Sequence, residues 1–332
     1  VKCCPVPGGR LKSFDFDVIK GRKGVIQAVE LIQVKDELGR TDQISGVAVV
    51  ADKFFRAKTA LDLMPIEWDL GPGVGLSSQS MEEEAQALLG KDAEHVEEVR
   101  GDPRPFLAAA SSDKLVTADY SRPTECHVTM SPAAAVVSIS DDRVDVWSKT
   151  QNVQGTLLQV ADQLGRDPKD VYMHGTFQGG GFGYGSAQPA PRQAAQIAQT
   201  VGRPVKVVWT REEDIKQART RPPVWGRFVA ALGDDGLPVA MQARTIGSSQ
   251  KPNFADRTIL DQHYQMPHYR FERHAVNSHI PFGYNRAPGA NSNGFLIEQF
   301  ADEMAIAGGW DPLDWRLKMT EGNERWQRVL KK

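Results

Sequence analysis

Residues 144–183 read VDVWSKTQNVQGTLLQVADQLGRDPKDVYMHGTFQGGGFG. Residues 144–148 alternate between apolar and other side chains, which predicts a strand, and residues 153–164 place apolar side chains at helical spacing. Gly165 suits the C-cap of this helix, because glycine adopts left-handed backbone angles without strain. Residues 171–177 predict a second strand that leads directly into a glycine-rich loop. The order strand, helix, strand, loop predicts a fold in which helices and strands alternate.

Further helices and strands are predicted on both sides of this stretch. Before it come a buried strand at 46–52, a helix at 54–64 with Phe54, Phe55, Ala57, Ala60, Leu61 and Met64 on one broad face, and a strand at 66–69. After it come a small-residue helix at 191–201 closed by Gly202, a strand at 204–210, a hairpin with arms 227–232 and 238–246 around Gly233-Asp234-Asp235-Gly236, and a helix at 295–307. The predicted fold class is therefore α+β, with helices and strands mixed along the chain.

The composition changes between residues 71 and 105. Gly-Pro-Gly and serines come first, followed by the acidic stretches 82–84 and 94–98. This pattern predicts a long connector that holds one exposed helix with a solvated acidic face, and it places a domain boundary here.

Length and composition limit the class of protein. The chain has 332 residues with a formal net charge of −2, and 40% of them are hydrophobic and 25% charged. This is enough for about two globular domains and excludes disordered and fibrous classes. The near-neutral charge argues against nucleic acid as a partner. No apolar run approaches a membrane span, and no targeting segment is recognisable at the start. Because Val1 is not a start methionine, we expect a fragment of a longer subunit.

Cysteine and histidine patterns predict no metal held by protein ligands. The three cysteines include the adjacent pair Cys3 and Cys4, and no C-x-x-C occurs, which excludes a thiolate-held iron–sulfur cluster or a c-type haem on this chain. We interpret His127 and His174 as packed or capping residues and Cys126 as a small buried residue. No G-x-S-x-G motif supports acyl transfer by a serine.

The glycine cluster at 179–183 is the sharpest local feature. Glycines let the backbone approach a ligand and expose N–H groups to anionic oxygens. The motif G-x-G-x-x-G does not fit, because Tyr184 or Ser186 stands at its last glycine. The P-loop motif does not fit either, because Ser186 stands at its lysine position. Two interpretations stay open from spacing alone: a ligand-binding loop, and a simple turn between a strand and a helix.

Two other segments concentrate polar groups among turn formers. Thr150-Gln151-Asn152 lies between a strand and a helix, where N-capping is the simplest interpretation. Residues 281–292 (PFGYNRAPGANS) surround Arg286, which is either a surface charge or an anion clamp with a fixed fork of donors. The tryptophans in strand and helix patterns are interpreted as core residues: Trp209, Trp310 and Trp315.

Taken in order, five segments resemble the molybdopterin-binding large subunit of the xanthine dehydrogenase and aldehyde oxidase family. Within that family they are most similar to the branch of the isoquinoline 1-oxidoreductase beta subunit and related bacterial aldehyde dehydrogenases. The segments are VAVVADKFFRAKTALDLMPIEWD (47–69), VWSKTQNVQGTLLQVADQLG (146–165), FQGGGFG (177–183), RQAAQIAQTVGRPVKVVWTREEDI (192–215) and FGYNRAPGANSNGFLIEQFADEMA (282–305). The resemblance implies that residues 1–69 are the C-terminal part of an α/β hammerhead domain, 70–105 a connector, and 106–332 the first molybdenum-cofactor-binding domain.

The resemblance also implies roles for individual residues. Gln151 is expected to donate a hydrogen bond to an oxygen on molybdenum, and Arg286 to line the substrate side, so both are expected at the catalytic centre and at the cofactor. The loop of Gly180, Gly181, Phe182 and Gly183 is expected to wrap the pterin. These groups suit their targets, because amide N–H groups and an arginine stabilise oxygens that carry negative charge. The family's catalytic glutamate lies in a second molybdenum-binding domain, which we expect on another chain or on further residues.

The implied reaction is the oxidation of an aldehyde to a carboxylic acid with water as the oxygen donor. The implied cofactor is molybdopterin, with the cytosine dinucleotide form as one option. Electrons would pass to a [2Fe–2S] centre on a small partner subunit, and then to a cytochrome c subunit or another acceptor. Two alternatives are hydroxylation of an N-heterocycle and a noncatalytic structural subunit of such a complex. The resemblance favours a periplasmic or membrane-associated location.

Overall fold

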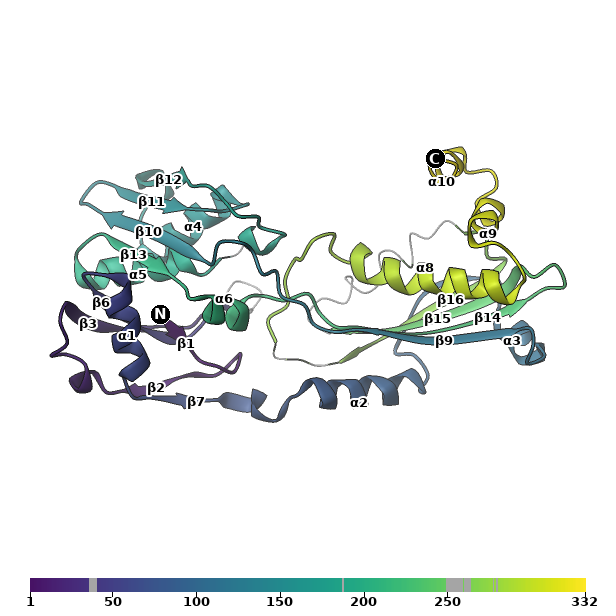
Figure 1. The fold of residues 1–332 in the computed structure, drawn as a ribbon, viewed down its shortest axis with the longest axis horizontal. Coiled ribbons are helices and arrows are strands. Elements are labelled where there is room, and N and C mark those ends of the chain that lie inside the picture. The colour runs from purple at the N-terminus through teal and green to yellow at the C-terminus, as the bar shows by residue number, and fades with distance from the viewer. Residues whose placement is uncertain (36–40, 187, 249–258, 260–263, 277, 279) are drawn as a thin grey trace. The chain divides into compact units, whose positions relative to one another are not determined.

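The computed structural model describes residues 1–35, 41–186, 188–248, 259, 264–276, 278 and 280–332. Helices and strands are mixed along the chain, so the predicted fold class is confirmed (Figure 1). The chain divides into two compact units that are interleaved in sequence. Unit 1 comprises Val1–Gly75, Cys126–Arg221 and His279–Arg286, and unit 2 comprises Leu76–Glu125, Pro222–Ser278 and Ala287–Lys332. The predicted division at 69 and 105 stays a prediction.

Unit 1 begins with a small antiparallel sheet in the order β1 (Lys2–Cys3), β6 (Gly46–Ala51) and β3 (Val25–Leu31). Helix α1 (Phe54–Leu63) packs on it through Ala60 and Leu61. The expectation that Phe54 and Phe55 share this buried face is wrong, since they are 51% and 74% exposed. They occupy the first turn of α1, and the buried residues of the helix, Ala60 and Leu61, lie in its second half. Strand β7 (Ile66–Asp69), predicted at this position, pairs with β2 (Arg10–Phe14).

The larger sheet of unit 1 has four strands. Their order is β12 (Val171–Gly175), β11 (Val144–Ser148), β10 (Ala134–Ile139) and β13 (Val205–Val208). Only β11 and β12 run parallel among these pairs, because helix α4 (Val153–Leu164) connects them as a crossover. Gly165 closes α4 with a φ of 62°, as predicted.

Helix α5 (Ala190–Val201) joins the two sheets into one core. Its residues from 190 to 198 are all buried, because it packs against β10 and β13 with one face and against β3 with another. The small side chains of Ala194, Ala195 and Ala198 allow this close approach. On the β3 side, the Gln196 amide donates to the carbonyl of Glu30 at 3.0 Å. Gly202 ends the helix with a φ of 65°, as predicted.

Unit 2 is built on a five-stranded sheet. The strand order is β8 (His95–Arg100), β16 (His268–Val276), β15 (Pro238–Ser248), β14 (Val224–Leu232) and β9 (Leu115–Arg122). Strands β14 and β15 form the predicted hairpin. Successive side chains of a strand point to opposite faces. Accordingly, Phe228 of β14 packs in the core with α8 (Ala290–Ala307), whereas Trp225 donates its indole N–H to Glu82 of α2 (Ser78–Leu89) (Figure 1).

The stretch predicted as a connector contributes two elements to unit 2. Helix α2 is capped by Ser77 and buries Met81, Ala85 and Leu89, so it is amphipathic rather than exposed all round. Glu82, expected in a solvated run, accepts the Trp225 hydrogen bond. The acidic stretch 94–98 falls largely in β8, an edge strand whose charged side chains discourage pairing with another chain.

The remaining elements are short or lie near the C-terminus. They are β4 (Val34–Lys35), β5 (Thr41–Gln43), α3 (Arg104–Ala109), α6 (Arg211–Gln217), α9 (Pro312–Met319) and α10 (Glu324–Leu330). Helix α8 begins five residues before the predicted start. Trp209 and Trp315 are buried, as predicted, and Trp310 packs at the edge of the unit 2 core. Within the described residues, no helix has the length and apolarity needed to cross a membrane.

Candidate functional site

Two polar loops meet at one edge of the four-stranded sheet in unit 1. Strands β11 and β12 are parallel neighbours, so their carboxyl ends lie side by side. Residues 149–152 follow β11, and the glycine loop of residues 177–185 follows β12. The carboxyl end of parallel strands is the usual place for ligands in such sheets.

The segment Thr150–Asn152 is hydrogen-bonded to the glycine loop. The Gln151 N–H and the Thr150 hydroxyl donate to the carbonyl of Gly185 at 2.9 and 3.0 Å. The Asn152 side chain accepts from Gly155 N–H and caps α4. The predicted capping role therefore belongs to Asn152, and the Gln151 side chain takes no part in it.

The carboxamide of Gln151 has a fixed orientation. Its Oε1 accepts a hydrogen bond from the Gly183 N–H at 2.9 Å. Only the carbonyl oxygen of a carboxamide can accept, so Nε2 is the group left to donate. No described residue accepts from this Nε2, and the Gln151 side chain is exposed. Gln151 therefore presents an N–H donor at the surface of the glycine loop.

Two glycines of the loop are closely surrounded, Gly181 by the ends of side chains and Gly183 by backbone. A Cβ at Gly181 would lie 2.4 Å from Gln151 Oε1, and a Cβ at Gly183 would lie 2.4 Å from the carbonyl oxygen of Tyr284. Gly183 also has a φ of 99°, which strains any other residue. These contacts explain why the sequence needs glycine here, beyond what a simple turn would require.

Strained backbone is concentrated around the same loop. Four described residues other than glycine have positive φ: Val128 (45°), Phe182 (50°), Arg286 (22°) and Ala287 (52°). Phe182 belongs to the glycine loop, and its carbonyl accepts from Arg286 N–H at 2.8 Å. Near Val128, the Met130 N–H donates to Gly179 at 3.0 Å. Such residues cost about 1–3 kcal/mol each and cluster at functional sites.

The structure brings Arg286 to the glycine loop through its backbone. Backbone hydrogen bonds join Thr220 to residues 281 and 283 and anchor this loop. The guanidinium of Arg221 donates to the carbonyl of Arg286 at 3.4 Å. The Arg286 side chain is exposed. The predicted site residues Gln151, Gly180, Gly181, Phe182, Gly183 and Arg286 therefore belong to one connected set of loops in unit 1.

Sequence reasoning missed a buried lysine behind this site. Lys149 is 4% exposed, and its ammonium donates to the carbonyl and, at 2.8 Å, to the hydroxyl of Ser131. The Ser131 hydroxyl in turn accepts from Gly179 N–H at 3.3 Å. Burial lowers the pKa of Lys149. The only sequence signal was its place directly before Thr150–Asn152, and nothing in the sequence predicted that it would be buried.

His127 is a packed residue, as predicted. Its Nε2 lies 2.5 Å from the carbonyl of Tyr284, and its ring stacks on Tyr184. His174 has a different setting, because its Nε2 lies 2.6 Å from Asp145 and its ring stacks on Trp147. Hydrogen bonds from Arg143 and His174 lower the pKa of Asp145 to about 2. His127 therefore packs on Tyr184 of the glycine loop, and the Nε2 atoms of both histidines already have partners.

We expect His127 to make the protein less stable in mild acid. Burial lowers the pKa of its imidazole below the ordinary value of 6.5. The unfolded chain then binds more protons, so the free energy of unfolding falls as the pH drops below about 6.5 and through the lowered pKa. A His127→Gln variant, which cannot become charged, should lose less stability between pH 7 and pH 5 in denaturant titrations. The same loss in both proteins would contradict this prediction.

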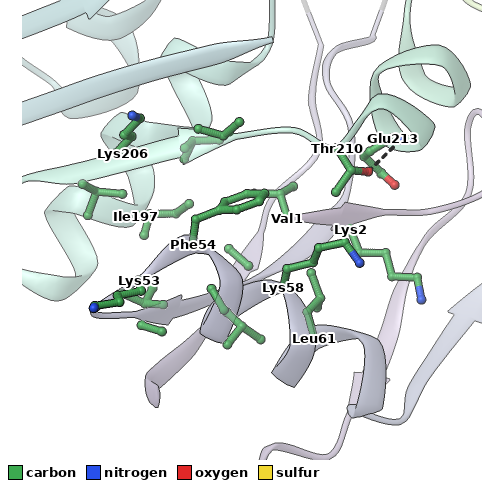
Figure 2. A pocket seen from close by; sticks show the side chains of 18 of the residues that line it. Val1, Lys2, Lys53, Phe54, Lys58, Leu61, Ile197, Lys206, Thr210 and Glu213 are labelled. Carbon is green, nitrogen blue, oxygen red and sulfur yellow. Dashed lines mark hydrogen bonds between the residues drawn. The ribbon is translucent and has the colours of Figure 1, made fainter. Parts of the chain in front are cut away.

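A separate pocket of about 920 Å³ lies elsewhere in unit 1 (Figure 2). It is lined by residues in and next to β6, α1, α5, β13 and α6, including Lys53, Phe54, Ile197 and Lys206. None of the predicted site residues lines it. The pocket and the glycine loop are therefore separate features of unit 1.

The glycine loop, the Gln151 amide and the Arg286 loop agree with a match to a known family. A model of the molybdopterin cofactor-binding domain matches residues 89–320. The chain belongs to this family. The resemblance to the xanthine dehydrogenase and aldehyde oxidase family, expected from the sequence, is confirmed.

Individual relatives of this molybdopterin-binding chain are distant in sequence. The aldehyde oxidoreductase molybdenum-binding subunit PaoC from Escherichia coli K12 is 24% identical over 93% of this chain and 44% of its own length. The isoquinoline 1-oxidoreductase subunit beta from Brevundimonas diminuta is 24% identical over 86% of this chain and 39% of its own length. Quinoline 2-oxidoreductase from Pseudomonas putida 86 has the same fold, with a TM-score of 0.76 at 19% identity over 97% of this chain and 46% of that one. This chain spans less than half the length of each of these proteins.

Proposed function

We propose that this chain is the part of a molybdenum hydroxylase that holds the molybdopterin cofactor, and that the complete enzyme oxidises an aldehyde to a carboxylic acid. The observation that carries the proposal is the Gln151 carboxamide. Its oxygen is held by Gly183 N–H, so its nitrogen is an oriented donor at the surface of the glycine loop. An oriented amide donor beside glycine N–H groups suits a ligand with several electron-rich oxygens.

The residues of the site fit such a cofactor. Gly181 and Gly183 place no side chain of their own over the loop backbone, so a flat polar ring system can approach the backbone there. The exposed Arg286 guanidinium offers a fork of donors on the side where a substrate carbonyl would develop negative charge. When bound, the cofactor would supply the two-electron redox chemistry, and the protein would supply orientation and electrostatics.

The proposed reaction has simple requirements. An aldehyde and one water give a carboxylic acid, two protons and two electrons. The electrons would leave through a [2Fe–2S] centre on a small partner subunit, and then through a cytochrome c subunit or another acceptor. A second molybdenum-binding domain, on another chain or on further residues, would supply the catalytic glutamate. The molybdopterin cytosine dinucleotide is included in this proposal as one form of the cofactor. A periplasmic or membrane-associated location is part of the same proposal.

Hydroxylation of an N-heterocycle is the second candidate. It is supported by the names of two relatives, isoquinoline 1-oxidoreductase subunit beta and quinoline 2-oxidoreductase. Both reactions introduce oxygen from water, so they differ in substrate rather than in the residues that this chain supplies. If the chain is instead a noncatalytic structural subunit, neither reaction is supported.

Turnover in labelled water separates these candidates. The purified complex is supplied with an aromatic aldehyde or with isoquinoline, an artificial electron acceptor and H₂¹⁸O. The proposal predicts ¹⁸O in the carboxylic acid and faster turnover of the aldehyde. Faster turnover of isoquinoline would support the second candidate. No product from either compound, in a complex that contains molybdenum, would contradict both.

We expect Arg286→Ala to lower kcat/KM for the aldehyde by about tenfold or more, because a charge-assisted donor to the substrate is lost. The backbone contact to Phe182 does not need the side chain, so the loop should keep its conformation. Steady-state kinetics and molybdenum content test this together. Arg143→Ala is the control, since Arg143 pairs with Asp145 on an exposed sheet face. Equal kcat/KM in Arg286→Ala and the wild-type enzyme would contradict the role of Arg286.

A further inference from the structure

Gln178, directly before the glycine loop, has a buried amide nitrogen with no hydrogen-bond partner among the described residues. A buried N–H group without a partner costs about 1–3 kcal/mol. The Gln178 side chain lies against the glycine loop that follows it. A Cβ at Gly181 would lie 2.5 Å from Gln178 Nε2, and one at Gly185 would lie 2.4 Å from it.

The carboxamide of Gln151 lies against the same two glycines. Its Oε1 would be 2.4 Å from a Cβ at Gly181 and 2.9 Å from a Cβ at Gly185. The Gln151 oxygen and the Gln178 nitrogen are therefore neighbours beside these two glycines, with no hydrogen bond between them. Gln151 Oε1 already accepts from Gly183 N–H, and a carbonyl oxygen has a second lone pair for another donor.

The buried position of Gln178 Nε2 excludes a direct contact with a ligand in this conformation. Protein atoms cover it, whereas Gln151 is exposed. Its effect on a ligand must therefore pass through another protein group. The neighbouring oxygen of Gln151 is an acceptor within reach of a change in the side-chain torsion angles of Gln178.

We propose that Gln178 is a positioning residue that, after a change in its side-chain torsion angles, donates its amide N–H to Gln151 Oε1. With Gly183 N–H and Gln178 Nε2 both directed at this oxygen, the Gln151 carboxamide cannot rotate by half a turn, and its own Nε2 stays directed outward. This inference rests on the proposed function, because it gives the Gln151 donor its orientation toward the cofactor.

A double-mutant cycle tests the inference in the purified complex. Gln178→Leu and Gln178→Glu each remove the donor, and the glutamate variant keeps the length and shape of the side chain. Each is expected to lower kcat about fivefold or more with molybdenum content unchanged. In the Gln151→Ala background the same substitutions should have no further effect on kcat, because the group that Gln178 positions is gone. A residue that only stabilises the fold would give additive effects.

A spectroscopic readout accompanies the kinetics. The Mo(V) electron paramagnetic resonance spectrum should change in Gln178→Glu in the same direction as in Gln151→Ala. Gln196→Leu is the matched control, because Gln196 is a buried glutamine of α5 that donates to Glu30 and lies outside the loop. It should lower the unfolding temperature without changing the spectrum or kcat.

The outcomes separate the inference from the proposed function. Additive effects on kcat, or an unchanged spectrum in both Gln178 variants, would overturn the role of Gln178 and leave the proposed function standing. Absence of molybdenum from the wild-type complex would overturn both. Coupled effects with a changed spectrum and full molybdenum content are the result that we expect.

Discussion

Replacement of Gly183 by alanine is expected to lower the molybdenum content of the purified complex about tenfold or more. The new Cβ would lie 2.4 Å from the carbonyl oxygen of Tyr284, and a backbone atom cannot move aside as the end of a side chain can. The φ of 99° adds strain that glycine avoids. The loop would have to change its conformation and release the hydrogen bond from Gly183 N–H to Gln151. Metal analysis of the variant complex measures the effect.

Gly165→Ala is the matched control for this prediction. Gly165 also has a left-handed φ, of 62°, but open space surrounds its Cβ position. The substitution should cost about 1 kcal/mol of stability through backbone strain and leave the molybdenum content unchanged. Equal molybdenum in wild-type and Gly183→Ala complexes would show that the loop does not need its observed conformation to hold the cofactor.

Gln151→Ala is expected to lower kcat about tenfold or more while the protein keeps its fold. The substitution removes an oriented donor, and donors of this kind contribute most when charge develops during a reaction. Since the Gln151 side chain is exposed, its loss should cost little stability. Steady-state kinetics with the aldehyde and thermal unfolding of the same preparation measure both quantities.

The control for Gln151→Ala is Gln154→Ala, an exposed glutamine three residues further along, on α4. It should leave both kcat and the unfolding temperature close to those of the wild-type protein. Wild-type turnover in Gln151→Ala would remove Gln151 from the site and with it the main support for the proposed function.

Local patterns in the sequence predicted several elements of unit 1, but not β1, β2, β3, β10 or α6. Strands β6, β7, β11 and β13, and helices α1, α4 and α5, lie where alternation, helical spacing and glycine caps place them. These signals are local, because each depends on residues within one or two turns of the chain. The resemblance to a known family then singled out Gln151 and Arg286. Spacing alone favoured a capping role for the segment of Gln151 and left Arg286 as either a surface charge or an anion clamp.

Contacts between distant segments could not be predicted in the same way. The pairing of β8 with β16 joins residues more than 160 positions apart. No local pattern in residues 94–98 predicts this pairing. The burial of Lys149 depends on its contact with Ser131. The burial of the Gln178 amide nitrogen depends on its position beside Gly181 and Gly185. Phe54 and Phe55 fit the apolar stripe of a helix, yet only Ala60 and Leu61 of α1 are buried. Burial is a property of the assembled fold and is not contained in a window of sequence.

The most direct test of the proposed function is the molybdenum and pterin content of the natively purified protein with all its copurifying chains. We predict close to one molybdenum and one pterin per copy of this chain. A preparation with its partner chains intact but without molybdenum would contradict the proposal and leave this chain a structural subunit.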